Sequence, residues 1–405
     1  MKFFHTADWH LGKLVQGVNM TEDQRYVLEQ FIRAVEEEKP DAVVIAGDLY
    51  DRGIPSTDAV NLLDETLKTI VIDLKTPVLA IAGNHDSPSR LNFGSEIMKA
   101  NGLHIAGQFA DRFEPVVLED DFGKVHFHLV PYADPSIVRT VLEDDEIGTH
   151  NEAMKKTIER ITEKMDPSAR HVFVGHAFVT PHGEAADNTS ESERPLAIGG
   201  TEYVEAGLFE KFHYTALGHL HQAHYVLNET IRYAGSILKY SISEEHHKKG
   251  FYVVHLDGEG RVSVEKRLLK PKHDMRSVEA YMDDLLTHPV NEDYVFVTLL
   301  DEEPVLAPME KVRSVYPNAM HVERKIIVPS DKEEPERDEP ARHQMDTFSL
   351  FKTFYREMKG SEPGEETLHL FKEVVHEIGQ EFHIELNQAG KEAAAAVERQ
   401  GGEER

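Results

Sequence analysis

Residues 78–86 read Val-Leu-Ala-Ile-Ala-Gly-Asn-His-Asp, an apolar run that passes through one glycine into three polar side chains. The apolar part, Val78 to Ala82, has the length and composition of a buried strand. Gly83 begins a loop, and Asn84, His85 and Asp86 follow it directly. An amide, an imidazole and a carboxylate just past a buried strand predict a functional site at the edge of a sheet.

Working outward, similar segments recur along the chain, mostly just after apolar strand-like runs. They are Asp8-Trp9-His10, Gly47-Asp48, Gly175-His176 and Gly218-His219-Leu220-His221. Because ligands in open α/β sheets gather where strands end, we expect these polar side chains to converge on one crevice. In extended backbone, residues i and i+2 point the same way, so each Asp-X-His or His-X-His segment would present two ligands and turn Trp9 or Leu220 inward.

The combined set offers enough nitrogen and oxygen ligands for two adjacent divalent cations. The predicted metal ligands are Asp8, His10, Asp48, Asn84, His176, His219 and His221. Asp48 is the candidate to bridge both ions, because a carboxylate has two oxygens and Gly47 lets the backbone come close. Two ions roughly 3.5–4 Å apart lower the pKa of a shared water and offset the charge of a phosphoryl group, which predicts phosphoester cleavage.

Neighbouring residues receive supporting roles. His85 faces away from Asn84, so we predict that it acts as a general acid on the leaving oxygen and not as a ligand. Asp51 and Asp86 are candidates to orient ligand imidazoles through the second ring nitrogen. Contacts to substrate are assigned to Arg90, Tyr233 and Ser236, although exposed polar residues are commoner than contacts.

The remaining histidines that we considered are interpreted as ordinary core or surface residues, because a single histidine is more often satisfied locally than bound to a metal. These are His5, His104, His126, His128, His171, His224, His246 and His247.

The composition narrows the class of protein. There is no cysteine among 405 residues, so disulfides, thiolate metal sites and a cysteine nucleophile are excluded, and a reducing cytoplasm fits. No apolar run approaches the roughly 18 residues that span a bilayer, and the stretch after Met1 is too short for a secretory signal. Lys and Arg number 44 against 73 Asp and Glu, and the net charge of -29 repels nucleic acid at long range.

The first hundred residues have a βαβ rhythm, with strands at Lys2 to Thr6 and Asp41 to Ala46 around a helix from Thr21 to Glu38. Thr21 is expected to cap this helix, and Ser56 to open the next. Short strands then dominate Val116 to Val130 and Tyr214 to Arg267, with a helix at Lys155 to Met165 and a strand at His171 to Val174 between them. Two sheets packed face to face would account for this, so the fold class is α/β, a four-layer α/β/β/α sandwich.

The C-terminal third divides into smaller pieces. Residues 271–328 form a small α+β unit, read as helix, strand (Tyr294 to Leu299), helix and strand (Ala319 to Val328) from Ser277 onward. Residues 329–342 are a charged, proline-punctuated linker. Residues 343–385 hold two amphipathic helices suited to docking on the main body or, more in keeping with the linker, on a partner protein. Their apolar residues are Phe351, Phe354, Tyr355, Met358, Leu368, Phe371, Val374, Val375, Ile378 and Phe382, and residues 386–405 form a tail.

The ordered motifs resemble the calcineurin-like metallophosphoesterase superfamily. Within it, four segments look like the SbcD family, the nuclease subunits of bacterial SbcCD complexes, and the resemblance extends to about Phe382. The segments are Thr6-Ala-Asp-Trp-His-Leu-Gly12, Gly83-Asn-His-Asp-Ser-Pro88, Ala216-Leu-Gly-His-Leu-His221 and Tyr233-Ala-Gly-Ser236.

The resemblance implies a homodimeric, manganese-dependent DNA nuclease in DNA repair, recombination and replication. It implies exonuclease cutting of double strands from 3′ ends, endonuclease cutting of single strands and hairpins, and control by the SMC-like ATPase SbcC in a heterotetramer. One ion would be held by Asp8, His10, Asp48 and His221, and the other by Asp48, Asn84, His176 and His219, with His85 as the catalytic histidine. Residues 1–270 would be the nuclease domain, 271–328 a DNA-capping domain, and the helix pair would grip the partner's coiled coil.

Two alternatives remain open at this point. Gly47-Asp-Leu-Tyr-Asp-Arg-Gly53 also resembles a serine/threonine phosphatase motif in which the arginine grips phosphate. Those phosphatases are expected to have Glu in place of Asp86 and to lack the Gly-His-Leu-His segment, so a metal-dependent phosphatase is the runner-up. A metal-free scaffold on the same fold would be expected to have lost ligands, and this chain has kept them.

Overall fold

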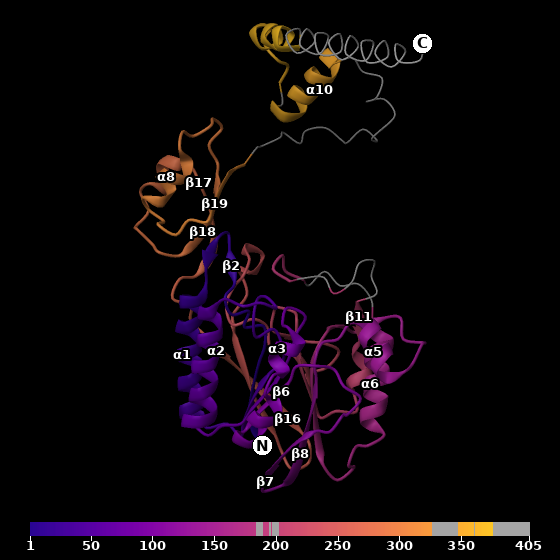
Figure 1. Cartoon of the computed structure of the whole chain (residues 1–405). Coiled ribbons are helices and arrows are strands. Elements are labelled where there is room, and N and C mark those ends of the chain that lie inside the picture. Colours follow the sequence, from indigo (N-terminus) through magenta and orange to yellow (C-terminus); the bar gives the residue numbers. More distant parts are fainter. Residues whose placement is uncertain (184–188, 194–195, 197–201, 326–346, 360, 376–405) are drawn as a thin grey trace, which may run out of the picture. The chain divides into compact units, whose positions relative to one another are not determined.

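The computed structural model describes residues 1–183, 189–193, 196, 202–325, 347–359 and 361–375. The chain divides into two compact units, one of residues 1–300 with 305–323 and the other of residues 301–304 with 324–405. Figure 1 shows the elements of both units.

Two six-stranded sheets form the centre of the larger unit. The first has the order β16 (Val262–Leu268), β15 (Gly250–Leu256), β1 (Lys2–Thr6), β4 (Ala42–Ile45), β5 (Val78–Ile81) and β6 (Leu103–Ala106). The second has the order β13 (His224–Tyr225), β14 (Ile231–Tyr233), β12 (Tyr214–Gly218), β9 (Arg170–His176), β8 (Gly123–Val130) and β7 (Val116–Asp120). Strands β1, β4, β5 and β6 are parallel to one another, as are β8, β9, β12 and β14.

The two sheets pack face to face through apolar side chains. Phe3 of β1 lies edge-on to Phe127 of β8 and Tyr214 of β12, with ring centroids 5.4 and 5.6 Å apart. Val44 and Leu79 of the first sheet belong to the same buried cluster. All of these side chains are fully buried, so this inter-sheet layer is the central part of the core.

Helices cover the outer faces of the sheets, as Figure 1 shows. On the first sheet, Phe31 of α1 (Thr21–Glu38) packs against Phe4 and Phe251, and α2 (Thr57–Lys68) contributes Leu63 to that cluster. On the second sheet, Ile158 of α6 (His150–Thr162) packs with Phe173, and α5 (Pro135–Leu142) lies beside α6. The four-layer α/β/β/α prediction is confirmed.

Short elements connect these layers. They are β2 (Leu14–Val15), β3 (Val18–Asn19), the π-helix η1 (Thr69–Asp73), α3 (Pro88–Asn92), α4 (Ser95–Met98), η2 (Lys99–Asn101), β10 (Phe178–Thr180), β11 (Tyr203–Glu205), η3 (Ala206–Phe209) and η4 (Ile242–Glu244). Among the described residues, no helix combines the length and apolar character that crossing a bilayer requires.

The capping or first residue of three helices can be compared with the expected one, and two of the three differ. Thr21 does not cap α1, because it is already the first helical residue and Asn19 Oδ1 accepts its N–H and hydroxyl. Ser56 does cap α2, since its Oγ accepts the N–H of Ala59 at 3.3 Å. Helix α6 begins at His150, earlier than Lys155, because Thr149 and Glu152 form a reciprocal capping box.

The small α+β unit begins with a strand and not with a helix. Its elements are β17 (Met275–Ala280), α7 (Met282–Leu285), β18 (Tyr294–Leu299), α8 (Pro308–Arg313) and β19 (His321–Arg324). Residues 275–280 pair in parallel with β18, and this pairing outweighs the weak helical pattern that begins at Ser277. Tyr294 joins the unit to the first sheet's helix layer, because its hydroxyl donates to Asp23 of α1 at 2.8 Å.

In the smaller unit, α10 (Thr347–Lys359) and a second helical stretch at residues 365–375 are described. The rings of Phe351 and Phe371 stack nearly parallel, with centroids 3.8 Å apart. Phe354 and Leu370 are 58% and 63% exposed, so this helix pair leaves large apolar side chains uncovered. The linker at 329–342, the tail at 386–405, the side chain of Met358, and Ile378 and Phe382 lie outside the described part.

An ion pair at the base of the second sheet predicts an acid-sensitive contribution to stability. Arg170 of β9 donates to Asp120 of β7 at 3.1 Å, and this hydrogen bond is the main reason that the pKa of Asp120 lies below its usual 3.8. The carboxylate therefore stabilises the fold fully above about pH 4, and the contribution is lost as the pH falls further. Asp120→Asn should lower the melting temperature at pH 6, and the difference from the unmodified chain should shrink towards pH 3.

Asp121→Asn is the matched control, because Asp121 is an exposed neighbour of Asp120. It should leave the melting temperature nearly unchanged at both pH values. A deficit for Asp120→Asn that stays constant between pH 6 and pH 3 would contradict the assignment.

Candidate metal centre

The predicted ligands come from the carboxyl ends of strands in both sheets. Asp8 follows β1, Asp48 follows β4 and Asn84 follows β5, whereas His176 ends β9 and His219 follows β12. Main-chain hydrogen bonds join the first two loops, since Asp8 N–H donates to Gly47 O at 3.1 Å and His10 N–H donates to Asp48 O at 2.9 Å. The expected convergence on one place is therefore what the fold produces.

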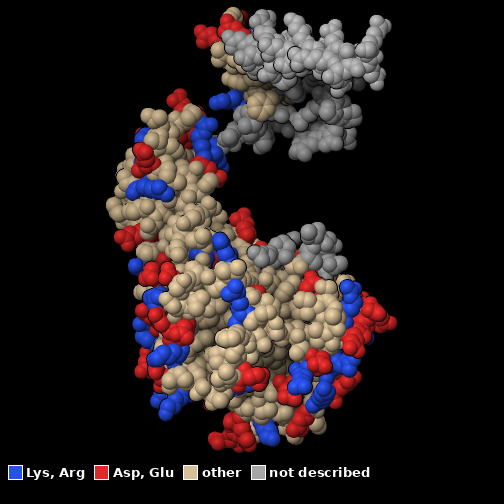
Figure 2. Space-filling view, in the orientation of Figure 1, with Lys and Arg blue, Asp and Glu red and all other residues tan. Residues whose placement is uncertain are grey.

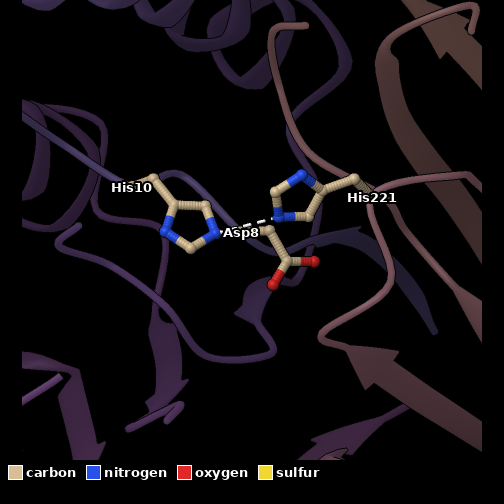
Figure 3. A group of neighbouring side chains, drawn as sticks. All are labelled: Asp8, His10 and His221. Carbon is tan, nitrogen blue, oxygen red and sulfur yellow. Dashed lines mark hydrogen bonds between the residues drawn. The ribbon is translucent and has the colours of Figure 1, made fainter. Parts of the chain in front are cut away.

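One group consists of Asp8, His10 and His221, whose nearest ligand atoms lie within 4.8 Å of one another. Figure 3 shows the two imidazoles facing each other with the carboxylate of Asp8 beside the space between them. The Nε2 atoms of His10 and His221 are 3.0 Å apart, and all three side chains are buried. Two ring nitrogens and a carboxylate oxygen on one small space are a donor set for a divalent transition metal.

A second group lies on the other side of Asp48. His176 Nε2 is 2.9 Å from Asn84 Oδ1, and His219 Nδ1 is 3.3 Å from the same oxygen. Asp48 Oδ2 is 3.5 Å from His176 Nε2 and 3.6 Å from His10 Nε2. The Asp48 carboxylate thus lies between the two groups, at the position that a bridging ligand requires.

The backbone achieves this convergence in a way that the sequence pattern did not predict. Asp8, His10, Asp48 and His219 all have positive φ, at 52°, 46°, 52° and 108°. The expectation of extended backbone through Asp8-Trp9-His10 and His219-Leu220-His221 is therefore wrong, although Trp9 and Leu220 are fully buried as expected. Left-handed backbone at non-glycine residues costs on the order of 1–3 kcal/mol each and is concentrated at functional sites.

Two glycines are needed because other groups occupy the space of a side chain. A Cβ on Gly83 would lie 2.1 Å from Asp48 Oδ1, and a Cβ on Gly47 would lie 2.3 Å from His176 Nδ1. Gly47 also has a φ of +93°. At Gly47 and Gly83 a neighbouring ligand side chain lies directly against the main chain. This close approach explains why the Gly47-Asp48 and Gly83-Asn84 motifs each contain a glycine.

Hydrogen bonds set the tautomers of two histidines. His176 Nδ1 donates to Ala46 O at 2.9 Å, and His221 Nδ1 faces Glu244 Oε1 at 3.1 Å. Each Nε2 is therefore the atom with a free lone pair, and each points towards the centre. His10 Nδ1 is buried and has no hydrogen-bond partner among the described residues. That nitrogen faces Asp51, so Nε2 is the His10 atom directed at Asp48 and His221. The Nε2 atoms of these histidines beside buried carboxylates form a donor set that fits divalent cations.

The electrostatics of the protein alone favour the same conclusion. Burial, and then the charge of Asp48, raise the pKa of Asp8 well above its usual value. Burial, and then neighbouring imidazoles, lower the pKa of His10 and His219 well below the usual value. Neutral imidazoles carry no positive charge that could offset two neighbouring carboxylates. A bound cation would supply that charge and would favour the ionised form of both carboxylates.

His85 is held beside this centre in one orientation. Its Nδ1 donates to Asp51 O at 2.8 Å, its N–H donates to Asp48 Oδ1 at 2.9 Å, and its ring lies nearly perpendicular to that of His10 with centroids 4.6 Å apart. Nδ1 is occupied, so Nε2 is the nitrogen available to a substrate.

The structure gives Asp51 and Asp86 other contacts than the predicted ones. Asp86 accepts the main-chain N–H groups of Leu49, Tyr50 and Gly83 at 3.1, 2.9 and 3.0 Å, so it ties two loops together and does not orient an imidazole. Burial, and then Asp48, raise the pKa of Asp86 to about 7. The Asp51 carboxylate lies 3.9 Å from His10 Nδ1, beyond hydrogen-bonding distance, and pairs with Lys13 at 2.8 Å.

Two of the predicted substrate contacts have hydroxyl groups that bond within the protein, and their contact with substrate stays a prediction. Tyr233 is fully buried and donates to Ala177 O at 2.8 Å, and Ser236 is buried and donates to Leu238 O at 2.7 Å. Both hydroxyls are occupied in holding the main chain. Arg90 is exposed on α3 and stays a candidate.

The sequence pattern missed four residues that contact His221. Glu244 and Ser192 lie against its Nδ1, and Lys249 and Glu193 bond its main-chain oxygen and N–H. Glu244 and Lys249 stand in the polar run Glu244-Glu-His-His-Lys-Lys249, which is typical of a solvent-exposed segment. Glu244 and Lys249 differ from the other residues of this run in their burial in the folded chain, so no local sequence pattern could have identified them.

Comparison with known families agrees with this geometry. The model of the calcineurin-like phosphoesterase family matches residues 1–223, and a model described as the type 5 capsule protein repressor C-terminal domain matches residues 271–359. The SbcD component of the nuclease SbcCD from Staphylococcus epidermidis is 36% identical over 324 residues, which cover 79% of this chain and 84% of that protein.

The chain belongs to the SbcD family of calcineurin-like phosphoesterases. The resemblance stated from the motifs is thereby confirmed, and the nuclease interpretation is favoured over the phosphatase.

Solved structures are more distant. GAP50 of Plasmodium, the anchor in its inner membrane complex, is 12% identical with a TM-score of 0.40, covering 83% of this chain and 99% of its own. A dimetal phosphatase from Danio rerio is 12% identical with a TM-score of 0.38, covering 66% and 96%. At these scores the likeness adds nothing to the argument.

The close approach at Gly83 predicts the effect of one methyl group. Gly83→Ala places its Cβ against Asp48, so Asp48 must move; we expect a loss of about 1–3 kcal/mol of unfolding free energy and weaker Mn²⁺ binding. Thermal unfolding and calorimetric titration with Mn²⁺ measure the two effects.

Gly53→Ala is the matched control in the same region, because its Cβ would meet nothing closer than 3.6 Å. It should fold and bind Mn²⁺ like the unmodified chain. Normal Mn²⁺ binding by Gly83→Ala would contradict the crowded position inferred for Asp48.

Proposed function

We propose that this chain is a DNA nuclease subunit that hydrolyses phosphodiester bonds with two divalent metal ions. The observation that carries the proposal is the position of Asp48, whose Oδ2 lies 3.5–3.6 Å from the Nε2 atoms of His176 and His10. A carboxylate between two sets of imidazole donors supports a two-metal centre with one shared ligand.

Asp8, His10, Asp48 and His221 would hold one ion, and Asp48, Asn84, His176 and His219 the other. Mn²⁺ is the ion we propose, because mixed carboxylate, amide and imidazole ligands suit it and the family resemblance implies it. When bound, two such ions lower the pKa of a water molecule and neutralise charge on the phosphoryl oxygens.

His85 supplies the proton that the leaving oxygen needs. The Asp51 carbonyl fixes Nδ1 as the donor within the protein, so the ring can present a protonated Nε2 only as the imidazolium. Proton transfer from Nε2 of the imidazolium to the departing oxygen returns the neutral ring. Asp86 contributes by holding the loop of Asn84 and His85 against the loop of Asp48.

We propose 3′-to-5′ exonuclease action on double strands and endonuclease action on single strands and hairpins, in DNA repair, recombination and replication. The net charge of -29 opposes DNA binding at long range. On the face in Figure 2, however, acidic and basic side chains are interspersed along the two flanks, and the middle is largely uncharged with a few basic and a few acidic side chains. DNA contacts by a partner and by bound metal ions would further offset the charge.

The partner we propose is an SbcC-type SMC-like ATPase, gripped by the helix pair of residues 343–385 in the cytoplasm. The preceding segments would act as a nuclease domain (1–270), a capping domain (271–328) and a linker (329–342). We also propose a homodimer, and thus a heterotetramer with SbcC. An open groove of about 510 Å³ beside α2 offers an apolar surface for the second copy, with Val60, Ile72 and Phe93 exposed along it.

Replacing His85 separates catalysis from metal binding. His85→Ala should reduce cleavage of linear DNA in Mn²⁺ by about 10²–10⁴-fold, because the general acid is lost, and should leave Mn²⁺ binding intact. Gel-based nuclease assays and calorimetric Mn²⁺ titration measure the two properties. The same experiment tests the phosphatase alternative. In that alternative Arg52, the arginine of the phosphatase-like motif, would bind the phosphate; its side chain is 65% exposed and lies beside Asp51.

His255→Ala is the control, because the His255 side chain is exposed on β15, away from the core. It should cut DNA at the normal rate. Release of phosphate from monoesters without any DNA cutting would overturn the nuclease proposal in favour of the phosphatase, and full activity of His85→Ala would overturn the role of His85.

The exposed apolar side chains of the helix pair predict a separable partner site. Phe354→Ala and Leu370→Ala should each weaken binding to the SbcC-type coiled coil about tenfold or more, because exposed anchors dominate such interfaces. Nuclease activity of the isolated chain should not change. Binding is measured by calorimetry with the coiled-coil fragment, and Lys352→Ala, at an exposed polar position of the same helix, is the control.

Undiminished binding by both apolar variants would show that this helix pair is not the docking site. A parallel loss of nuclease activity would show that the substitutions act on the fold.

A further inference from the structure

His221 is fastened by charged side chains on its ring and on both of its main-chain polar groups. Glu244 Oε1 lies 3.1 Å from His221 Nδ1, and Lys249 Nζ donates to His221 O at 2.9 Å. Glu193 Oε1 accepts the His221 N–H at 2.5 Å. These three residues come from two other segments of the chain, so the position of this one candidate ligand is set by tertiary contacts.

Glu244 and Lys249 form a buried ion pair. Glu244 is 0% exposed, Lys249 is 7% exposed, and Lys249 Nζ bonds Glu244 Oε2 and also Ser236 Oγ at 2.8 Å. Removing two charges from water costs free energy that their attraction often fails to recover, so a buried pair adds little to stability by itself. The pair does, however, hold an ionised carboxylate at a fixed place directly behind an imidazole.

Among the described residues, no such carboxylate bonds the second ring nitrogen of His176 or His10. His176 Nδ1 donates to a neutral main-chain carbonyl, that of Ala46. His10 Nδ1 stays 3.9 Å from the Asp51 carboxylate, and that carboxylate is paired with Lys13. A carboxylate that accepts from the far nitrogen orients the ring and makes the near nitrogen a stronger donor than a carbonyl does. The two proposed metal positions are therefore supported unequally.

We propose that Glu244, held in place by Lys249, is a positioning residue that makes the position formed by Asp8, His10, Asp48 and His221 the tighter of the two metal positions. It acts through His221 and touches neither substrate nor metal. Ser192 is an auxiliary, because its Oγ lies 2.7 Å from His221 Nδ1 and also bonds Glu244. This inference rests on the proposed two-metal function.

The test is a Mn²⁺ titration of the full chain, followed by calorimetry and by the electron paramagnetic resonance signal of the paired ions. Glu244→Gln should weaken the tighter of the two binding events about 10–100-fold and leave the weaker one unchanged, so that the paired-ion signal needs a higher Mn²⁺ concentration; a loss confined to the weaker event would overturn the inference. The double variant Glu244→Gln/Lys249→Met should behave in the same way, and it leaves no buried lysine without its carboxylate if the single variant folds poorly.

Two variants act as controls. Ser192→Ala keeps the Glu244 contact at the same histidine and should change the tighter binding event by a few-fold at most. Asp120→Asn breaks a partly buried ion pair between β7 and β9, far along the sheet from His176, and should lower the melting temperature without changing Mn²⁺ affinity.

Normal affinity for both ions in the folded double variant would overturn the inference, and so would an equal loss at both positions. Failure of the unmodified chain to bind two Mn²⁺ ions would instead overturn the proposed function itself and, with it, the inference. The Mn²⁺ titration of the unmodified chain therefore tells whether the proposed function fails, and the titration of the double variant tells whether only the inference fails.

Discussion

The structure depends on the burial of Asp8 and Asp48 among imidazoles where two sheets meet. Each carboxylate is almost fully buried, and Asp8 is destabilised in its ionised form by burial and by the nearby charge of Asp48. Among the described residues, no lysine or arginine forms an ion pair with either carboxylate; Lys13 pairs with Asp51 and Lys249 with Glu244. Divalent cations are the complement that this arrangement of charge requires.

The surrounding architecture can be understood as support for that arrangement. Strand ends from both sheets deliver the side chains, and four of the seven candidate ligands adopt left-handed backbone at a cost that ordinary packing must offset. The inter-sheet core of Phe3, Phe127 and Tyr214 provides a rigid base, and Asp86 binds three N–H groups of the two loops that carry Asp48 and Asn84. Ligand geometry is thus built on rigid strands, and the loops are fastened to one another.

The sequence predicted these parts of the molecule to different extents. Strand β1 at Lys2–Thr6 and helix α1 at Thr21–Glu38 agree with the predicted bounds, because apolar periodicity is a local signal. The convergence of the seven candidate ligands was also predictable, since each stands in a short motif at or just past the end of a strand. The motif around Tyr233 and Ser236 did not reveal that both side chains are buried, because burial cannot be inferred from a polar residue in a motif. The contacts of Glu244 and Lys249 join distant segments, so no local pattern could predict them. The extended backbone assumed for Asp8 to His10 failed for the same reason, since cross-loop hydrogen bonds to Gly47 and Asp48 impose another conformation.

The most direct measurement is anomalous X-ray scattering from crystals grown with Mn²⁺. The account predicts two peaks roughly 3.5–4 Å apart, both within coordinating distance of Asp48, one beside His10 and His221 and the other beside Asn84 and His176. No peak at this place, or a single peak that Asp48 does not contact, would contradict it.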